Sequence, residues 1–394
     1  MGSLLDVPGV LVGHDHRIGD GWLTGVTAVV LPPGSTGGVD VRGGGPGTAE
    51  TDALDPSTLV QTVDAVALCG GSAYGLSAAT GVQLWLESQG QGYAVPGGVV
   101  PIVPAAVIFD LGRGGDFTAR PDVAMGFAAA AAAGPGGTHD GGLRGCVGAG
   151  AGAVLGRGMY KGGIGMASVR IPAGPVPVPP GMPEVELPEG LVVGALAVVN
   201  AAGMPVVGPG TPALATQAGQ DAAERSAAEE VPEAAGAATA APGPGGGSGA
   251  GPAAGAGGAG AARAGASGPG GAAGPAAGAS APGAVAGGAN TTLVVVATNA
   301  ALSPAECRRL ATAAHAGLAR ALDPSHTLVD GDTVFAVSTG GLDLDRTSDA
   351  ARVAGLMAVQ IAAADATRLA ILDGVRSATA VTTPAGTWLP FPLP

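Results

Sequence analysis

The chain has 394 residues, among them 74 Gly and 33 Pro, and its formal net charge is −13 at pH 7. Because acidic residues predominate and no Lys- or Arg-rich run occurs, we expect no nucleic-acid partner and no membrane partner. The opening residues lack the basic and apolar regions of a secretory signal, and apolar runs such as 127–133 are too short to cross a membrane. A cytoplasmic protein is therefore expected.

The first 208 residues carry the pattern of a mixed α/β region. Apolar or β-branched runs bounded by turn residues predict strands at 25–31, 65–69, 102–111, 162–171 and 191–200. Apolar residues at helical spacing predict a helix at 74–89, and composition predicts a second helix at 122–133. The run at 191–200 is almost continuously apolar, which is typical of a strand buried on both faces.

The composition changes after Gly208. An acidic stretch at 216–233 predicts a short helix, and residues 241–290 contain 19 Gly, 19 Ala, 6 Pro and 3 Ser. Such a tract cannot bury enough apolar surface to offset its ordering entropy. We therefore predict a flexible low-complexity loop over residues 209–290.

Regular structure is predicted again after this loop. The elements expected, in chain order, are a β-branched strand at 291–299, a helix at 304–322, a strand at 333–338 and an Ala-rich helix at 346–374. Ser303, Pro304 and Glu306 form the capping-box pattern that opens a helix. Strands and helices on both sides of the loop indicate layered α/β packing.

Few residues are candidates for catalysis or for binding a metal or cofactor. Cys69, Cys146 and Cys307 are too widely spaced for a disulfide framework or a zinc motif, and the five histidines show no ligand spacing, so no metal is expected. GGSAYGL at 70–76 is similar to a phosphate-binding loop but lacks its Lys-Ser/Thr, so a tight strand-to-helix turn lining the pocket is expected and no cofactor. Lys161 is the only lysine of the chain. A residue type kept once in such a chain is more often functional than a common one.

The junction of loop and strand at Asn290-Thr291-Thr292 has two interpretations. One is a turn residue followed by ordinary strand residues. The other is self-cleavage that makes Thr291 a new N-terminus: its hydroxyl attacks the preceding carbonyl, the resulting ester is hydrolysed, and the freed α-amine then acts as base for that hydroxyl. Composition alone leaves both interpretations open.

Several longer motifs occur in an ordered, collinear series. They are LLDVPGVLVGH (4–14), LTGVT (23–27), GVDVRGGGPGTAETDAL (38–54), LCGGSAYGL (68–76), VPIVPAAVIFDLG (100–112), GAGAGA with MYKGGIGMAS (148–168), ALAVVNAAG (195–203), NTTLVVVATNA (290–300) and DGDTVFAVSTG (330–340). In these motifs the chain resembles the L-aminopeptidase/D-esterases, β-aminopeptidases and nylon-oligomer hydrolases, which are self-cleaving N-terminal-nucleophile hydrolases. The Asn-Thr-Thr junction is most similar to that of the nylon-oligomer (6-aminohexanoate oligomer) hydrolases.

The resemblance implies a four-layer αββα sandwich built as one domain. Residues 1–208 are expected to form the α-chain part of this domain, residues 209–290 the loop that ends at the cleavage site, and residues 291–394 the β-chain that completes it. The resemblance further implies a homotetramer of αβ units.

The resemblance also assigns the site residues. It implies cleavage between Asn290 and Thr291, with Thr291 as nucleophile and Lys161 as a nearby cation that favours the deprotonated hydroxyl or neutral amine. It makes Asn200 an oxyanion donor. Asp330 and Asp332 match carboxylates that hold the amines of nucleophile and substrate. Each role has a plainer alternative: Lys161 as a surface cation, Asn200 as the cap of a strand end, and the Asp-Gly-Asp sequence as an ordinary turn.

One member of the oxyanion hole is not assigned. The family places an aromatic hydroxyl near the oxyanion, and this chain has only three tyrosines, Tyr74, Tyr93 and Tyr160, while Phe127 falls near a position that is aromatic in relatives. The match at this point of the site is therefore incomplete.

The function implied is autoprocessing hydrolysis of a small peptide or amide that carries a free amine. The substrate classes left open are α-peptides, β-peptides, D-amino acid esters and nylon oligomers. Two other functions also remain open: acyl transfer of the glutamate/ornithine acetyltransferase type, and a processed interaction protein without catalytic activity.

Overall fold

The computed structural model describes residues 2–133, 142–176, 185–206 and 290–393. All of these residues belong to one structural unit, which spans residues 1–214 and 286–394. The segments before and after the long gap share a sheet, because strand β14 (Val192–Asn200) pairs antiparallel with β16 (Thr291–Ala300).

Two five-stranded sheets form the centre of this unit. The first sheet has, in spatial order, β1 (Leu11–Gly19), β2 (Trp22–Val30), β5 (Ala65–Cys69), β8 (Ala105–Val107) and β4 (Thr48–Ala49). The second sheet has β11 (Ile164–Arg170), β14, β16, β18 (Thr333–Leu342) and β3 (Thr36–Val41). Within the second sheet only β16 and β18 run parallel. Strand β16 is the central strand of this sheet and pairs with a neighbour on each edge.

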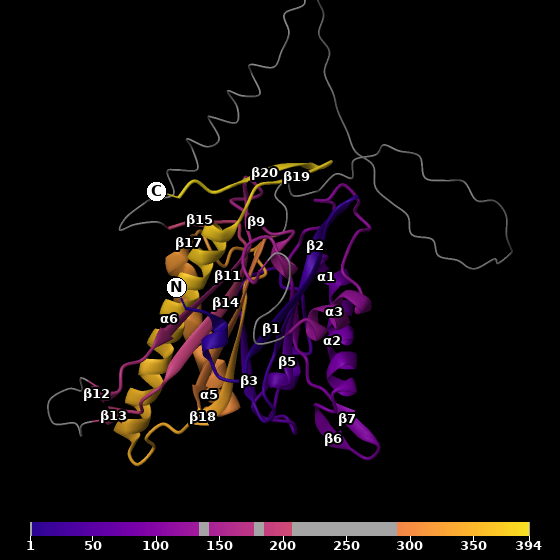
Figure 1. Ribbon diagram of the computed structural model, residues 1–394. Helices are drawn as coiled ribbons and strands as arrows, with labels where there is room; N and C mark the ends of the chain where they lie inside the picture. Colours follow the sequence, from indigo (N-terminus) through magenta and orange to yellow (C-terminus); the bar gives the residue numbers. More distant parts are fainter. Residues whose placement is uncertain (1, 134–141, 177–184, 207–289, 394) are drawn as a thin grey trace, which may run out of the picture. The chain divides into compact units, whose positions relative to one another are not determined.

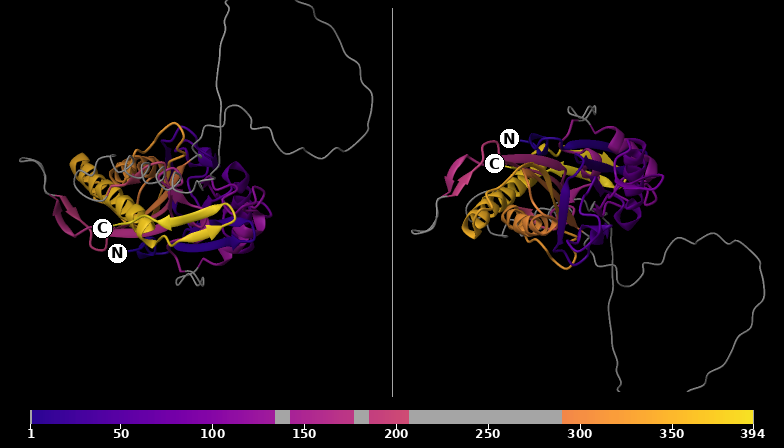
Figure 2. Two further views of the ribbon diagram at one scale, coloured as in Figure 1. Left: turned by 90° about the horizontal axis from the view of Figure 1, so that it is seen from above. Right: turned by 90° about the horizontal axis from the view of Figure 1, so that it is seen from below.

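Helices cover the outer face of each sheet. The helices are α1 (Ser72–Gly75), α2 (Ser77–Ser88), α3 (Val123–Ala131), α5 (Pro304–Ala321) and α6 (Asp349–Ser377), with short 3-10 turns at Leu4–Asp6, Thr51–Leu54 and Gly148–Gly150. Figure 1 shows α5 and α6 on one side of the strands and α1 to α3 on the other, and the views in Figure 2 agree. The order of layers is therefore helices, sheet, sheet, helices.

Alternation along the strands explains these layers. On β16, Val295 packs between the sheets while Val294 and Val296 pack toward α5 and α6. On β5, Leu68 packs between the sheets while Ala67 packs toward α2 and α3. Because successive side chains of a strand point to opposite faces, both faces of these strands are buried, and their sequences are continuously apolar. The predicted αββα sandwich is confirmed.

Short strands complete the unit. They are β9 (Val154–Leu155), β10 (Tyr160–Lys161), β19 (Val381–Thr383) and β20 (Gly386–Pro390) in a small four-stranded sheet, and the pairs β6 (Tyr93–Val95) with β7 (Gly98–Val100), β12 (Gly174–Val176) with β13 (Val185–Leu187), and β15 (Met204–Pro205) with β17 (Leu322–Asp323).

Most elements predicted from the sequence are present. The buried strands predicted at 191–200 and 291–299 are β14 and β16, and every residue of both is buried. The capping box predicted at Ser303 is formed: its side chain accepts from the N–H of Glu306, and the Glu306 side chain accepts from the N–H of Ser303.

Two predictions of length were wrong. The helix expected at 74–89 begins earlier, at Ser72, and is divided: α1 ends at Gly75 and α2 starts at Ser77, with Leu76 between them. The strand expected at 102–111 is limited to β8, because Pro104 offers no N–H for pairing. The loop predicted at 209–290 and the helix at 216–233 lie outside the described residues, except for Asn290.

Helix α6 is the one described helix that is long and apolar enough to cross a membrane. Its most apolar window has a mean hydropathy of 1.4, and 56% of that window is buried in the unit. Val359, Ala363 and Ile371 pack into the core beneath the second sheet. The helix is thus apolar because it is part of the core, and its apolar window is interrupted by polar residues, so no unbroken apolar run marks it in the sequence.

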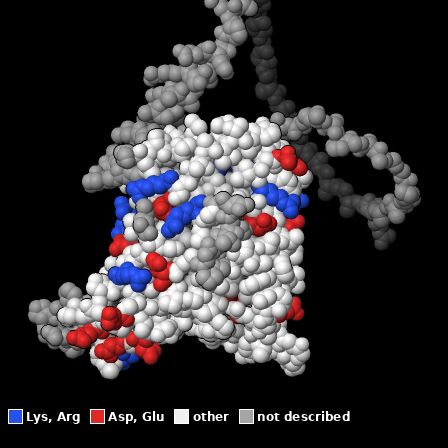
Figure 3. Space-filling view, viewed as in Figure 1, with Lys and Arg blue, Asp and Glu red and all other residues white. Residues whose placement is uncertain are grey.

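Charged side chains are sparse on the surface. On the face shown in Figure 3, the acidic and basic side chains of the described residues are interspersed, and the acidic ones gather at the lower end of the view. This face presents no continuous basic surface to a nucleic acid.

Candidate active site

The bond predicted to be cleaved lies at the start of β16. Asn290 and Thr291 are only 2% and 4% exposed. Thr291 Oγ1 donates a hydrogen bond of 2.6 Å to the carbonyl oxygen of Asn290, and the backbone N–H of Gly331 donates to the same oxygen at 2.8 Å. This carbonyl therefore has two buried donors, an arrangement that polarises it and stabilises negative charge on its oxygen.

Gly331 is tightly placed against the Thr291 hydroxyl. A Cβ atom added at this position would lie 2.6 Å from Thr291 Oγ1, closer than such contacts occur in proteins. The glycine of the Asp-Gly-Asp motif thus leaves room for the hydroxyl and supplies the N–H that faces the scissile carbonyl.

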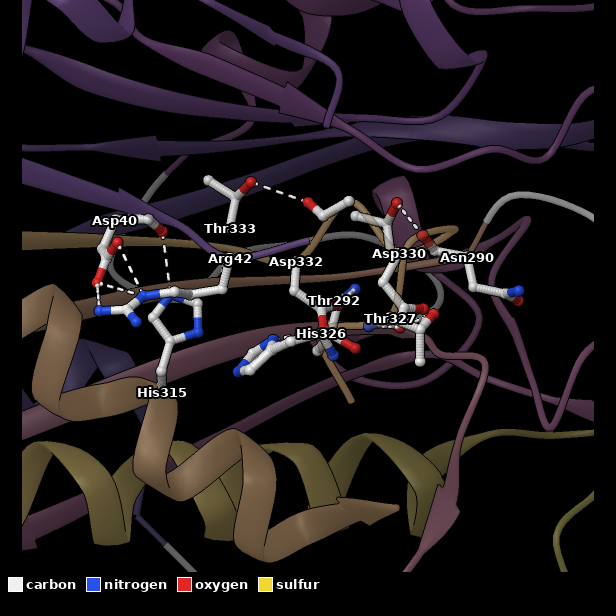
Figure 4. A network of polar contacts seen from close by, with 12 residues as sticks. Asp40, Arg42, Asn290, Thr292, His315, His326, Thr327, Asp330, Asp332 and Thr333 are labelled. Carbon is white, nitrogen blue, oxygen red and sulfur yellow. Dashed lines mark hydrogen bonds and ion pairs between the residues drawn. The ribbon is translucent and has the colours of Figure 1, made fainter. Parts of the chain in front are cut away.

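Asp332 holds the backbone next to the nucleophile. Its Oδ1 accepts from the N–H of Thr292 at 2.7 Å, and its Oδ2 accepts from the N–H of His326 at 3.0 Å and contacts His326 Nδ1 at 2.9 Å (Figure 4). The His326 ring in turn contacts the ring of His315 edge to face, with centroids 4.8 Å apart. Both oxygens of the Asp332 carboxylate therefore have hydrogen-bond partners, and one of them holds the backbone at the start of β16.

Asp330 lies on the other side of Gly331. Its Oδ2 accepts from the N–H and the hydroxyl of Thr327 at 2.7 and 2.6 Å. Burial raises the pKa of Asp330; the bonds from Thr327 oppose this shift and the nearby Asp332 adds to it. Both aspartates lie close to the Asn290–Thr291 junction and bind different partners (Figure 4), and their predicted hold on the amines of nucleophile and substrate stays a prediction.

The glycine run of the motif at 38–54 binds the backbone of the Asp-Gly-Asp segment at 330–332. The N–H groups of Gly45 and Arg42 donate to the carbonyls of Asp330 and Asp332 at 2.8 and 3.0 Å. A Cβ on Gly43 would lie 2.1 Å from the Asp330 carbonyl oxygen. Only glycine allows two backbone segments to approach this closely, so the run positions the Asp-Gly-Asp motif.

Asn200 stands opposite Thr291 in the register of β14 and β16. Its Oδ1 accepts from Arg113 Nη1 at 2.6 Å and from the N–H of Val154 at 3.1 Å. Its Nδ2 is buried and has no hydrogen-bond partner among the described residues. This leaves an amide donor open on the strand opposite Thr291, and the oxyanion role of Asn200 stays a prediction.

Lys161 is fully buried, and its three donors bind backbone carbonyls. Nζ donates to the oxygens of Gly150, Ala153 and Gly162 at 3.0, 2.7 and 2.8 Å. Burial lowers the pKa of Lys161 to about 8. Lys161 also pairs in register with Val154, which binds Asn200. In this uncut chain the ammonium therefore supports the segment that holds Asn200, and the predicted direct action on the nucleophile stays a prediction.

A pH-dependent stability is expected from this buried lysine. Its pKa of about 8 in the folded chain is below the ordinary 10.5, so between these values the unfolded chain binds more protons and stability rises with pH. Two proteins are compared, Thr291→Ala and Thr291→Ala with Lys161→Met. Between pH 7.5 and 10.5, the unfolding free energy of the protein that keeps Lys161 should rise by on the order of 3 kcal/mol more than that of the protein without it. Urea unfolding at both pH values measures this, and an unchanged difference between the two proteins would contradict it.

Three groups at the site were not predicted from the sequence. They are the N–H of Gly331, the guanidinium of Arg113 and the ring of His326. Gly331 is part of the motif at 330–340, and Arg113 directly follows the motif at 100–112, so their places next to these motifs are the signal in the sequence that could have indicated them. His326 offered no signal beyond being one of five histidines.

The GGSAYGL segment forms the tight strand-to-helix turn that was expected. The Asp110 carboxylate accepts from the N–H of Gly71 at 2.6 Å, and burial raises the pKa of Asp110. The Gly71 N–H, which a bound phosphate would need as a donor, therefore already binds a carboxylate. Among the described residues, no group of three His, Cys, Asp or Glu side chains is arranged to hold a metal ion.

The three tyrosines and two surface cavities have other surroundings. Tyr74 stacks beneath Arg120 at 3.8 Å, Tyr160 contacts Phe391 edge to face at 5.1 Å, and Tyr93 is exposed. Two surface cavities of about 290 and 450 Å³ are lined by residues around β3 and around β19, and none of the five predicted catalytic residues lines either one.

Comparison with known proteins shows the family. The model of peptidase family S58 matches residues 2–388. An uncharacterized aminopeptidase of Mycobacterium tuberculosis is 42% identical over 392 residues, covering 96% of this chain and 94% of that protein. A 6-aminohexanoate-oligomer endohydrolase of Paenarthrobacter ureafaciens is 28% identical over 362 residues, covering 88% of this chain and 78% of that enzyme.

Solved structures show the same fold. The L-aminopeptidase D-Ala-esterase/amidase of Ochrobactrum anthropi, described as a variant of the Ntn-hydrolase fold, superposes with a TM-score of 0.61 at 18% identity, over 99% of this chain and 91% of that one. A Burkholderia β-aminopeptidase gives a TM-score of 0.58 at 21% identity, over 99% and 90%. The fold and the family inferred from the motifs are confirmed: the chain belongs to peptidase family S58 and is a hydrolase of peptide or amide bonds.

Proposed function

We propose that the chain is a self-processing amide hydrolase that cleaves its own Asn290–Thr291 bond and then uses Thr291 as N-terminal nucleophile. The α-chain would be 1–290 and the β-chain 291–394. The observation that carries the proposal is the pair of donors on the Asn290 carbonyl oxygen, one of them the Thr291 hydroxyl.

This contact supports the following course of self-cleavage. Thr291 Oγ1 forms a bond to the Asn290 carbonyl carbon, the oxygen takes up negative charge, and Gly331 N–H stabilises it. The C–N bond breaks and the hydroxyl proton passes to the Thr291 nitrogen, which leaves an ester. Water then hydrolyses the ester, giving the Asn290 carboxylate and a free Thr291 hydroxyl and α-amine.

Turnover uses the same atoms. The neutral α-amine takes the hydroxyl proton as Thr291 Oγ1 attacks the substrate carbonyl, and the leaving amine of the substrate receives that proton. The open Nδ2 of Asn200, on the strand opposite Thr291, would donate to the oxyanion. Water releases the acyl group and restores the nucleophile.

The proposed substrate is a small peptide or amide with a free amine. Asp330 and Asp332 supply carboxylates beside the junction, and a cationic amine would be attracted to them. The similar proteins are named for aminopeptidase and 6-aminohexanoate-oligomer hydrolase activity, and both substrate types carry an amine. A homotetramer of αβ units in the cytoplasm is proposed as well, and native mass spectrometry would test the assembly.

A substrate panel tests this function. Purified protein is assayed with p-nitroanilides of α- and β-amino acids and with linear 6-aminohexanoate oligomers, with N-acetylated forms of these substrates as matched controls and with cyclic oligomers, which have no free amine, as a further control. We expect release from free-amine substrates and at least about tenfold lower kcat/KM for the acetylated ones, because acetylation removes the cation. Equal rates would contradict the role of the carboxylates, and product formed only with an added amine acceptor would indicate acyl transfer.

A further inference from the structure

The Asn200 side chain has one defined orientation. Residues directly opposite in an antiparallel pair present their side chains on the same face, so Asn200 and Thr291 lie on one face of the sheet. A flipped amide would place its NH2 against the Arg113 guanidinium and the Val154 N–H, which are both donors. These two donors therefore keep Oδ1 turned toward them and Nδ2 turned away, buried and without a partner in the described part of the chain.

Arg113 is itself held in place. It lies in the loop after β8 of the first sheet and reaches across to the second, where Nη1 also donates to the carbonyl oxygen of Gly152 at 2.6 Å. Burial lowers the pKa of Arg113 to about 10, while the buried Asp110 carboxylate raises it. Arg113 is therefore charged at neutral pH, and Asp110 is in turn held by the N–H of Gly71.

A charged donor on Oδ1 changes what Nδ2 can do. Charge-assisted hydrogen bonds are shorter and stronger than neutral ones, and hydrogen bonds in a chain polarise one another. Polarisation of the Asn200 amide by the guanidinium makes its N–H a stronger donor toward developing negative charge.

We propose that Arg113 is a positioning residue of the active site, which locks and polarises the Asn200 amide so that Nδ2 donates to the oxyanion at Thr291. The inference rests on the proposed function, because Asn200 is the oxyanion donor there. Arg113 does not touch the reacting atoms and acts only through Asn200.

A double-mutant cycle tests this. Arg113→Met, Asn200→Ala and the double variant are compared for amide hydrolysis, with each rate normalised to the cleaved fraction from intact mass, so that a difference in self-cleavage does not enter the comparison. We expect Arg113→Met to lower kcat about 10- to 100-fold with KM within about twofold. In the Asn200→Ala background, the same change should cost less than about threefold.

Controls separate positioning from folding. Arg144→Met removes another partly buried arginine, whose Nε binds Asp373 at 2.7 Å away from the site, and should leave kcat unchanged. Added guanidinium should restore activity to Arg113→Ala but not to Asn200→Ala. Equal losses from Arg113→Met in both backgrounds, or no rescue by guanidinium, would overturn the proposal. Full activity of Asn200→Ala would instead overturn the proposed role of Asn200 itself.

Discussion

Thr291→Ala is expected to remain a single uncut chain and to lose amide hydrolysis by at least about 10³-fold. The substitution removes the hydroxyl that donates to the Asn290 carbonyl oxygen, and with it the proposed nucleophile of both reactions. Denaturing electrophoresis and a p-nitroanilide assay measure the two losses. Thr291→Ser keeps the hydroxyl and is expected to cut itself and to hydrolyse the substrate.

The neighbouring threonine gives a matched control. Thr292→Ala changes the same residue type one position later, and the Thr292 backbone N–H, which binds Asp332, is kept. It should be cut and active. Activity of Thr291→Ala near the wild-type level, or a cut in that variant at the same bond, would show that another group is the nucleophile.

Gly331→Ala is expected to slow self-cleavage by at least about 100-fold, the usual effect of losing one oxyanion donor. The added Cβ would lie 2.6 Å from Thr291 Oγ1, so either the hydroxyl or the Gly331 N–H must move from the Asn290 carbonyl oxygen. The rate is measured as the decline of the uncut chain after synthesis in a cell-free system.

Gly341→Ala is the control for this prediction. It lies in β18, and its Cβ would meet the Asn299 carbonyl oxygen at an ordinary 3.6 Å. Both variants are compared by thermal unfolding to separate a local effect from loss of fold. Wild-type cleavage of Gly331→Ala would rule out the proposed donor.

Local patterns predicted much of the fold. The continuous apolar runs of β14 and β16 indicated strands covered on both faces, and the Ser303 capping box marked the start of α5. These signals depend on neighbours in sequence. The break between α1 and α2 was not predicted, because the apolar residues Leu76, Ala79 and Val82 keep helical spacing across it.

The site was predicted in part, and mostly through resemblance. The motif match indicated Thr291, Asn200 and the two aspartates, and the structure places them around one junction. The contact of Arg113 with Asn200 joins residues 87 positions apart, and no local pattern encodes it. The binding of Lys161 to three backbone carbonyls likewise depends on the folded loop at 150–162.

The central claim is that the chain cuts itself before Thr291, and intact mass of the purified wild-type protein under denaturing conditions tests it most directly. We expect two species, one of them a chain that begins at Thr291 and ends with the C-terminal residue. N-terminal sequencing of that species should read Thr-Thr-Leu. A single uncut chain of 394 residues that hydrolyses amides would contradict the account.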